Sequence, residues 1–234
     1  MKRLVLAVLV VLVSACATYS PPTTESAAIQ ILTKGVDYAA QGKFREAKEE
    51  FEKALKADPS SEFAEDSLKV IKDVTDKKIE SKTAIHYFKG AAHFLNEQWD
   101  EAIADYDKAI ELNPRLAMVY VNRGFAYSNI GLLDQAISDY TKAIELNPGF
   151  AGAYVNRGSA YLSKGQYDRA ISDYSKAVEL NPNFAWAYLN RGLAYYYKGE
   201  HDKAWEDVHK VQSLGLQVHP DFLNALREAS GRER

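Results

Sequence analysis

Few side chains in this sequence could carry out chemistry. The five histidines are His86, His93, His201, His209 and His219. His86 and His93 are seven residues apart at positions that hold tyrosine in later segments, and none of the histidines has the HExxH spacing of a zinc site. We expect adjacent acids such as Glu49 and Glu50 to fall on solvated helix faces, and no nucleophile, base and orienting group come together in the sequence. The sequence therefore predicts no enzyme, no cofactor and no metal site.

The single cysteine, Cys16, follows a segment typical of an export signal. The chain begins MKRLVLAVLVVLVSACATYS, in which two cations precede ten apolar residues, Leu4 to Val13. Such a run is well short of the roughly 20 apolar residues that span a bilayer as a helix. Ala15 and Ala17 also form an A-x-A motif, so a signal peptidase could cut after Ala17 and release a soluble periplasmic protein.

Val13 to Cys16 resemble the lipobox of bacterial lipoproteins. This resemblance implies that the signal peptide is removed and that Cys16 is the lipidation site. A non-acidic residue after the cysteine, here Ala17, implies sorting to the outer membrane, with the chain facing the periplasm. The expected localisation is thus the bacterial cell envelope, with cleavage after Ala17 as the alternative.

Charged residues are interspersed along the chain. There are 29 cationic and 32 anionic side chains, which gives a net charge of −3. Because no basic field is formed, we expect no binding to nucleic acid. The hydrophobic content of 47% is that of a chain that buries a core.

A pattern with a period of 34 residues fills much of the chain. YVNRG occurs at 120–124 and again at 154–158, and YLNRG occupies 188–192. Prolines follow the same period at Pro114, Pro148 and Pro182. A fixed period of this length indicates stacked supersecondary units.

One period, residues 117–150, predicts two helices joined by a tight turn. Tyr120 and Gly124 share one face of the first helix. Gly131 suits a left-handed helix end, and Asp134 suits the N-cap of the second helix. We therefore expect an antiparallel helix pair in each period.

These residues resemble the tetratricopeptide repeat (TPR) family over about 28–216. The resemblance implies an all-α fold, a right-handed TPR solenoid of antiparallel helix pairs with a C-terminal capping helix. The expected organisation is a lipoprotein signal peptide at 1-15, a flexible tether at 16-27, TPR unit 1 at 28-61, a bridging helix at 62-82, TPR units 2-5 at 83-216, and a capping helix and tail at 217-234.

The arginine of each NRG motif has an acidic residue at a fixed spacing. Five cation and anion pairs stand sixteen residues apart: Lys34 with Glu50, Lys89 with Asp105, Arg123 with Asp139, Arg157 with Asp173, and Arg191 with Asp207. This regularity predicts structural ion pairs between the two helices of each unit.

An asparagine precedes each of these arginines, about 100° around the helix. In TPR proteins this position and its neighbours line the concave groove, so the resemblance implies that the amides hold an extended polypeptide. The predicted groove residues are Asn122, Asn156, Asn190, Met118, Phe125, Trp186, Leu193 and Tyr197. The alternative is that each asparagine bonds a neighbouring helix and keeps the repeats in register.

Taken together, these features predict a non-enzymatic protein–protein interaction scaffold or adaptor of the bacterial envelope. Its partner would be another protein, bound as an extended segment or a helix in the groove, and the membrane would be reached through the lipid on Cys16. A self-associating structural TPR protein, acting as a homo-oligomer, is the alternative.

Overall fold

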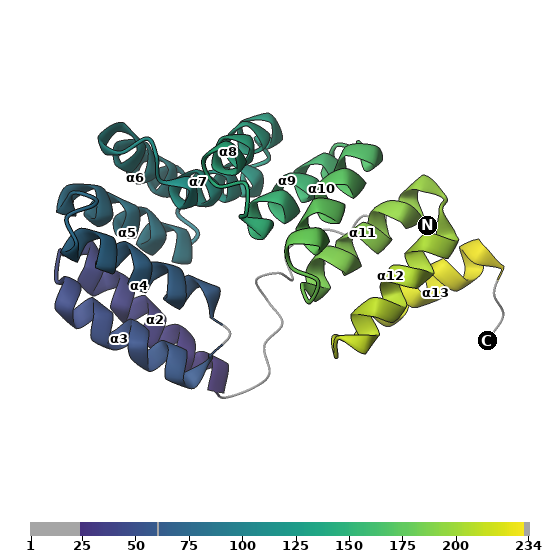
Figure 1. The fold of residues 1–234 in the computed structure, drawn as a ribbon, viewed down its shortest axis with the longest axis horizontal. Helices are drawn as coiled ribbons and strands as arrows, with labels where there is room; N and C mark the ends of the chain where they lie inside the picture. Colours follow the sequence, from purple (N-terminus) through teal and green to yellow (C-terminus); the bar gives the residue numbers. More distant parts are fainter. Residues whose placement is uncertain (1–23, 60, 232–234) are drawn as a thin grey trace. The chain divides into compact units, whose positions relative to one another are not determined.

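The computed structural model describes residues 24–59 and 61–231, and within them every regular element is an α-helix (Figure 1). The helices follow one another as pairs, which confirms the predicted all-α fold. No helix in the described ranges combines the length and the apolar content needed to cross a membrane. The chain divides into two compact units, residues 1–114 and 115–234. Cys16 and the predicted signal peptide lie outside the described residues.

The first unit holds an additional helix between two helix pairs. Its described helices are α2 (Thr24–Ala40), α3 (Phe44–Ala57), α4 (Glu62–Thr75), α5 (Ser81–Leu95) and α6 (Trp99–Leu112). α2 packs against both α3 and α5, α5 pairs with α6, and α4 packs against α3 and α5. The ring of Phe51 on α3 stacks on Phe88 of α5 at 5.9 Å and contacts Phe63 of α4 edge-on at 6.5 Å. These aromatic contacts join the additional helix to its neighbours.

The second unit contains three regular helix pairs and a final helix. Its described helices are α7 (Ala117–Asn129), α8 (Leu133–Leu146), α9 (Ala151–Ser163), α10 (Tyr167–Leu180), α11 (Ala185–Lys198), α12 (His201–Ser213) and α13 (Pro220–Ser230). α7 pairs with α8, α9 with α10, and α11 with α12, while α8 packs on α9 and α10 on α11. The first helices also contact one another, because α9 touches both α7 and α11.

The turns between the two helices of a pair place a glycine in the left-handed region, with one exception. Gly131 has a φ of 80° just after α7, as the sequence predicts. In the α5–α6 pair this position is Glu97, which takes a φ of 58° although it carries a Cβ. The prediction that Asp134 caps α8 is wrong, because the N-cap is Leu132, which makes no side-chain cap bond. α8 begins at Leu133, so Asp134 lies inside its first turn.

A glycine in the first helix of a pair faces an aromatic ring of the second. A Cβ built on Gly158 would lie 2.8 Å from Cε1 of Tyr174, a side chain with no exposed surface. Gly124 faces Tyr140 in the same way, also at 2.8 Å. Helix packing at this distance therefore requires glycine at these positions.

The last helix, α13, packs on α12, as expected for a C-terminal cap. Its residues Phe222 and Leu226 are buried. The Phe222 ring meets Tyr196 of α11 edge-on at 5.8 Å, and Nε1 of Trp205 on α12 donates to Oγ of Ser230 at 3.1 Å. α13 therefore covers an apolar surface of the last pair.

Candidate functional site

The arginine of each NRG motif lies between the two helices of its own pair. Nε and Nη2 of Arg157 on α9 donate to the two carboxylate oxygens of Asp173 on α10, each at 2.8 Å. The same two bonds join Arg123 to Asp139 and Arg191 to Asp207. These predicted ion pairs are confirmed.

Arg157 also bonds to the preceding pair. Its Nη1 donates to Oγ1 of Thr141 on α8 at 3.0 Å, and its guanidinium carbon lies 5.7 Å from the ring centre of Tyr154. The hydrogen bonds with Asp173 raise the pKa of Arg157. Nη1 of Arg191 makes the matching bond to Oγ of Ser175 at 3.1 Å. These guanidinium groups are engaged inside the protein, so their role is structural.

The pair predicted between Lys89 and Asp105 is wrong. Oδ1 of Asp105 lies 2.8 Å from Nδ1 of His86, and Oδ2 lies 3.5 Å from Nε2 of His93. These histidines occupy the positions of the tyrosines that flank the arginine in the second unit, and their nitrogens contact the carboxylate directly. Lys89 is exposed. The predicted pair of Lys34 with Glu50 is confirmed at 3.0 Å, and the hydrogen bonds from Lys34 and Lys53 lower the pKa of Glu50. Glu50 is buried, so the expectation that it lies on a solvated helix face is wrong.

A second face of the first helices contains the predicted groove residues other than Tyr197. This face, called the amide stripe, consists of Met118, Asn122 and Phe125 on α7, Gly152, Asn156 and Ser159 on α9, and Trp186, Asn190 and Leu193 on α11. Residues at i, i+4 and i+7 share a helix face. Because α9 contacts both α7 and α11, the three short rows are adjacent.

The asparagines of the amide stripe differ in exposure. Asn122 and Asn156 are half-buried, whereas Asn190 is only 6% exposed and Leu193 only 5%. Asn190 is flanked on its helix face by Trp186 and Leu193. The equivalent neighbours of Asn156 are the smaller Gly152 and Ser159, so the larger neighbours cover more of the Asn190 amide. The prediction that Asn190 and Leu193 line an open groove is therefore wrong. Met118, Phe125 and Trp186 are half-buried.

Tyr197 packs between helix pairs instead of lying in an open groove. Its ring stacks on Tyr167 of α10 with centres 5.8 Å apart and an angle of 15°. Its hydroxyl oxygen is buried and has no hydrogen-bond partner among the described residues. Burial raises the pKa of Tyr197 to about 12. Tyr197 is therefore not a candidate ligand contact.

Sequence reasoning missed two ion pairs that join consecutive helix pairs. Nζ of Lys164 lies 2.5 Å from Oδ1 of Asp134, and Nζ of Lys198 lies 2.8 Å from Oδ1 of Asp168. Both pairs have the same spacing of thirty residues, which a search at spacings other than sixteen would have found. Lys164 directly follows α9 and Lys198 is the last residue of α11, so both ion pairs neutralise a charge at the C-terminal end of a first helix.

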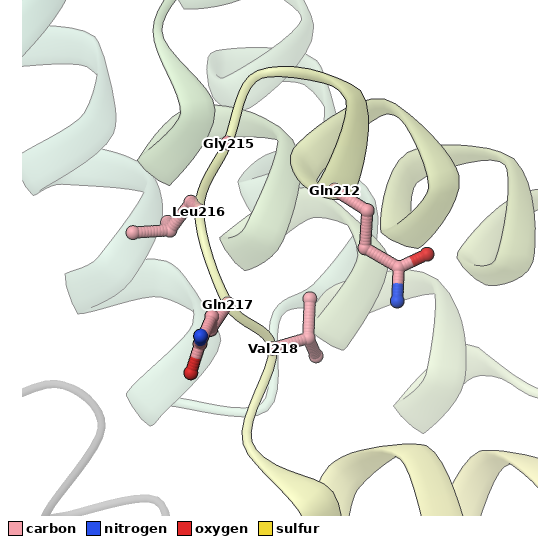
Figure 2. Close-up of a pocket in the computed structure, with 5 residues that line it drawn as sticks. All are labelled: Gln212, Gly215, Leu216, Gln217 and Val218. Carbon is pink, nitrogen blue, oxygen red and sulfur yellow. The ribbon is translucent and has the colours of Figure 1, made fainter.

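No group of residues in the described ranges is arranged to hold a metal ion. A shallow pocket lies at the connection between α12 and α13, with a volume of approximately 370 Å³ (Figure 2). It is lined by Gln212, Gly215, Leu216, Gln217 and Val218. Figure 2 shows Gln212 and Leu216 projecting to opposite sides of the connection. Since none of these side chains is charged or nucleophilic, the pocket does not suggest a catalytic site.

Several family profiles match the chain. One described as TPR repeat matches residues 90–131 and 158–199. Profiles described as tetratricopeptide repeat match residues 117–150, 139–172 and 31–61. Together the profiles cover more than half of the chain. The comparison with curated proteins returned no match.

Solved structures with the same fold include crystal structures of MamA. One is 29% identical with a TM-score of 0.55, and covers 77% of this chain and 94% of its own. A second is 28% identical with a TM-score of 0.54, and covers 82% of this chain and 98% of its own. A MamA double mutant reaches a TM-score of 0.56 at 20% identity, covering 80% and 94%, and shows the fold alone.

The profiles, the helix pairs and the glycine–tyrosine contacts agree with one another. Repeats of this type are generally non-catalytic, and their fold supports a role as a scaffold for protein interaction. The chain belongs to the tetratricopeptide repeat family.

Proposed function

We propose that this chain is an adaptor of the bacterial cell envelope that holds an extended segment of a partner protein on the amide stripe. The observation that most directly supports this proposal concerns the side chain of Asn156. This side chain is half-buried and makes no hydrogen bond to another described residue. The two N–H donors and the oxygen acceptor of its amide are therefore available to the backbone of a ligand. The absence of a bond to a neighbouring helix disfavours the register role for this residue.

The spacing of the helices suits an extended chain. Neighbouring packed helices lie roughly 8 to 10 Å apart, and an extended peptide rises about 3.3 Å per residue. Equivalent positions on neighbouring first helices are therefore separated by about three residues of an extended ligand. Hydrogen bonds alone contribute only about 0.5 to 1.5 kcal/mol each. Most of the binding energy must come from the apolar side chains of Met118, Phe125 and Trp186.

Replacing Asn156 by alanine should weaken partner binding by about 1 kcal/mol, roughly fivefold, because one ligand hydrogen bond is lost. Thermal stability should stay nearly unchanged. The partner would first be captured by crosslinking in native membranes, and its affinity for purified variants then measured by calorimetry. Gln135→Ala, on the exposed side of α8, is the control and should change neither quantity. A large fall in melting temperature with unchanged affinity would instead favour the register role.

Attachment to the envelope is proposed from the sequence of the first 17 residues, which lie outside the described part of the chain. Two or more acyl chains on one cysteine hold a protein stably on a membrane. We expect Cys16→Ser to move the protein from the membrane fraction to the soluble periplasmic fraction, or to leave it as an unprocessed precursor. Equal distribution of the wild type and the variant, with both cleaved after Ala17, would exclude the lipid anchor.

A further inference from the structure

The amide stripe contains no charged residue, and the helices that carry it hold few charges. α7 and α9 each contain one charged side chain, Arg123 and Arg157. α11 contains two, Arg191 and Lys198. The electrostatic character of this surface therefore depends on whether these four cations are available to a ligand.

All four cations are engaged within the chain. Each arginine bonds both oxygens of its aspartate, as described above, and its side chain is only 17 to 18% exposed. Lys198 lies 2.8 Å from Asp168 and 2.5 Å from Glu200. Lys164, just beyond α9, lies 2.5 Å from Asp134. A charged group on a ligand would thus meet amides, a hydroxyl and apolar groups, but no counter-ion.

From these contacts we infer that the segment bound by the amide stripe is uncharged wherever it touches the stripe. This inference rests on the proposed function and specifies the chemistry of its partner. A charge that is moved from water into a contact without a counter-ion loses hydration that nothing replaces. A neutral backbone with hydroxyl, amide and apolar side chains loses little on the same transfer, because the amide of Asn156 can bond its polar groups.

The sizes of the stripe residues add a second element of specificity. Gly152 and Ser159 on α9 are small, and they lie between Met118 and Phe125 on α7 and Trp186 on α11. A Cβ on Gly152 would come no closer than 3.5 Å to another side chain, the ring of Phe150. The central row is therefore lower than the rows beside it. A bulky apolar or aromatic side chain of the bound segment therefore fits best against the row on α9, next to Gly152 and Ser159.

Selection from a phage-displayed library of random twelve-residue peptides tests this inference. The target is the purified full chain in neutral detergent, and Gly152→Phe, which fills the low central row, is used for counter-selection. We expect enriched peptides to be depleted of Asp, Glu, Lys and Arg and to carry one aromatic residue. Their affinity should change by less than about twofold between roughly 0.05 and 0.5 M salt, because no charge pair is screened. Charged enriched peptides, or a tenfold loss of affinity in high salt, would overturn the inference.

A charge introduced into the stripe gives a matched test. Asn156→Asp keeps the shape of the side chain, and we expect it to weaken the selected neutral peptides at least tenfold. Peptides with one lysine near the same point should recover most of that loss on this variant. Gln135→Glu adds the same charge on the exposed side of α8 and should leave binding unchanged.

The outcomes separate this inference from the proposed function. If charged peptides bind the stripe, the inference that the bound segment is uncharged is wrong, but the proposed function stands. If no peptide is enriched on the wild type over Gly152→Phe, the proposed function falls as well.

Discussion

Gly158→Ala is expected to lower the free energy of unfolding by about 2 to 3 kcal/mol, within the range measured for overpacked cores. The added methyl group would lie 2.8 Å from Cε1 and 3.1 Å from Cδ1 of Tyr174. The ring cannot move aside easily, since it is fully buried and its hydroxyl lies 3.0 Å from Oγ of Ser159. α9 and α10 must therefore separate. Urea denaturation followed by circular dichroism measures the loss.

Gly192→Ala is the matched control for this prediction. Gly192 has the same place in α11, but Val208 replaces the tyrosine of the second helix, and the nearest atom to an added Cβ is Cβ of Asp207 at 3.3 Å. Alanine is also favoured over glycine within a helix by up to about 1 kcal/mol. We expect a change of less than about 1 kcal/mol in either direction. Equal losses for both variants would show that the aromatic ring is not the cause.

Contacts within one helix pair could be predicted from the sequence because the repeat fixes their geometry. Arg123, Arg157 and Arg191 stand at one spacing from their aspartates and meet them in the same way. The prediction failed for Lys89, where the charge pattern is kept but the flanking tyrosines are replaced by His86 and His93. Opposite charges at a fixed spacing are thus insufficient to predict an ion pair, because other side chains near the carboxylate can form the hydrogen bonds instead.

Contacts between pairs were harder to predict. The burial of Asn190 depends on the size of neighbours that differ from repeat to repeat, and the stacking of Tyr197 on Tyr167 joins two consecutive pairs. A period of 34 residues describes what the repeats share, so it cannot specify these differences. The helices expected to carry the candidate site are present, but Asn190 and Leu193 are less accessible than the sequence suggested.

Asp173→Ala should have the largest effect on stability, a loss of about 3 kcal/mol or more, typical of breaking a buried ion pair. The change removes both carboxylate bonds of Arg157, whose side chain is 17% exposed and keeps only its bond to Thr141 and its contact with Tyr154. The unpaired guanidinium cannot recover its hydration while it stays between α9 and α10. Urea denaturation of the variant against the wild type gives the value.

Two comparisons separate this explanation from a general effect of losing a charge. Glu179→Ala removes the acid of an exposed pair with Lys176, whose side chains are 69% and 40% exposed, and should cost at most about 0.5 kcal/mol. The double variant Arg157→Met with Asp173→Leu should recover most of the loss, because no unpaired charge remains in the interface. If the double variant is as unstable as Asp173→Ala, the loss arises from packing around the aspartate. The two arginine bonds would then contribute little to holding the helix pair together.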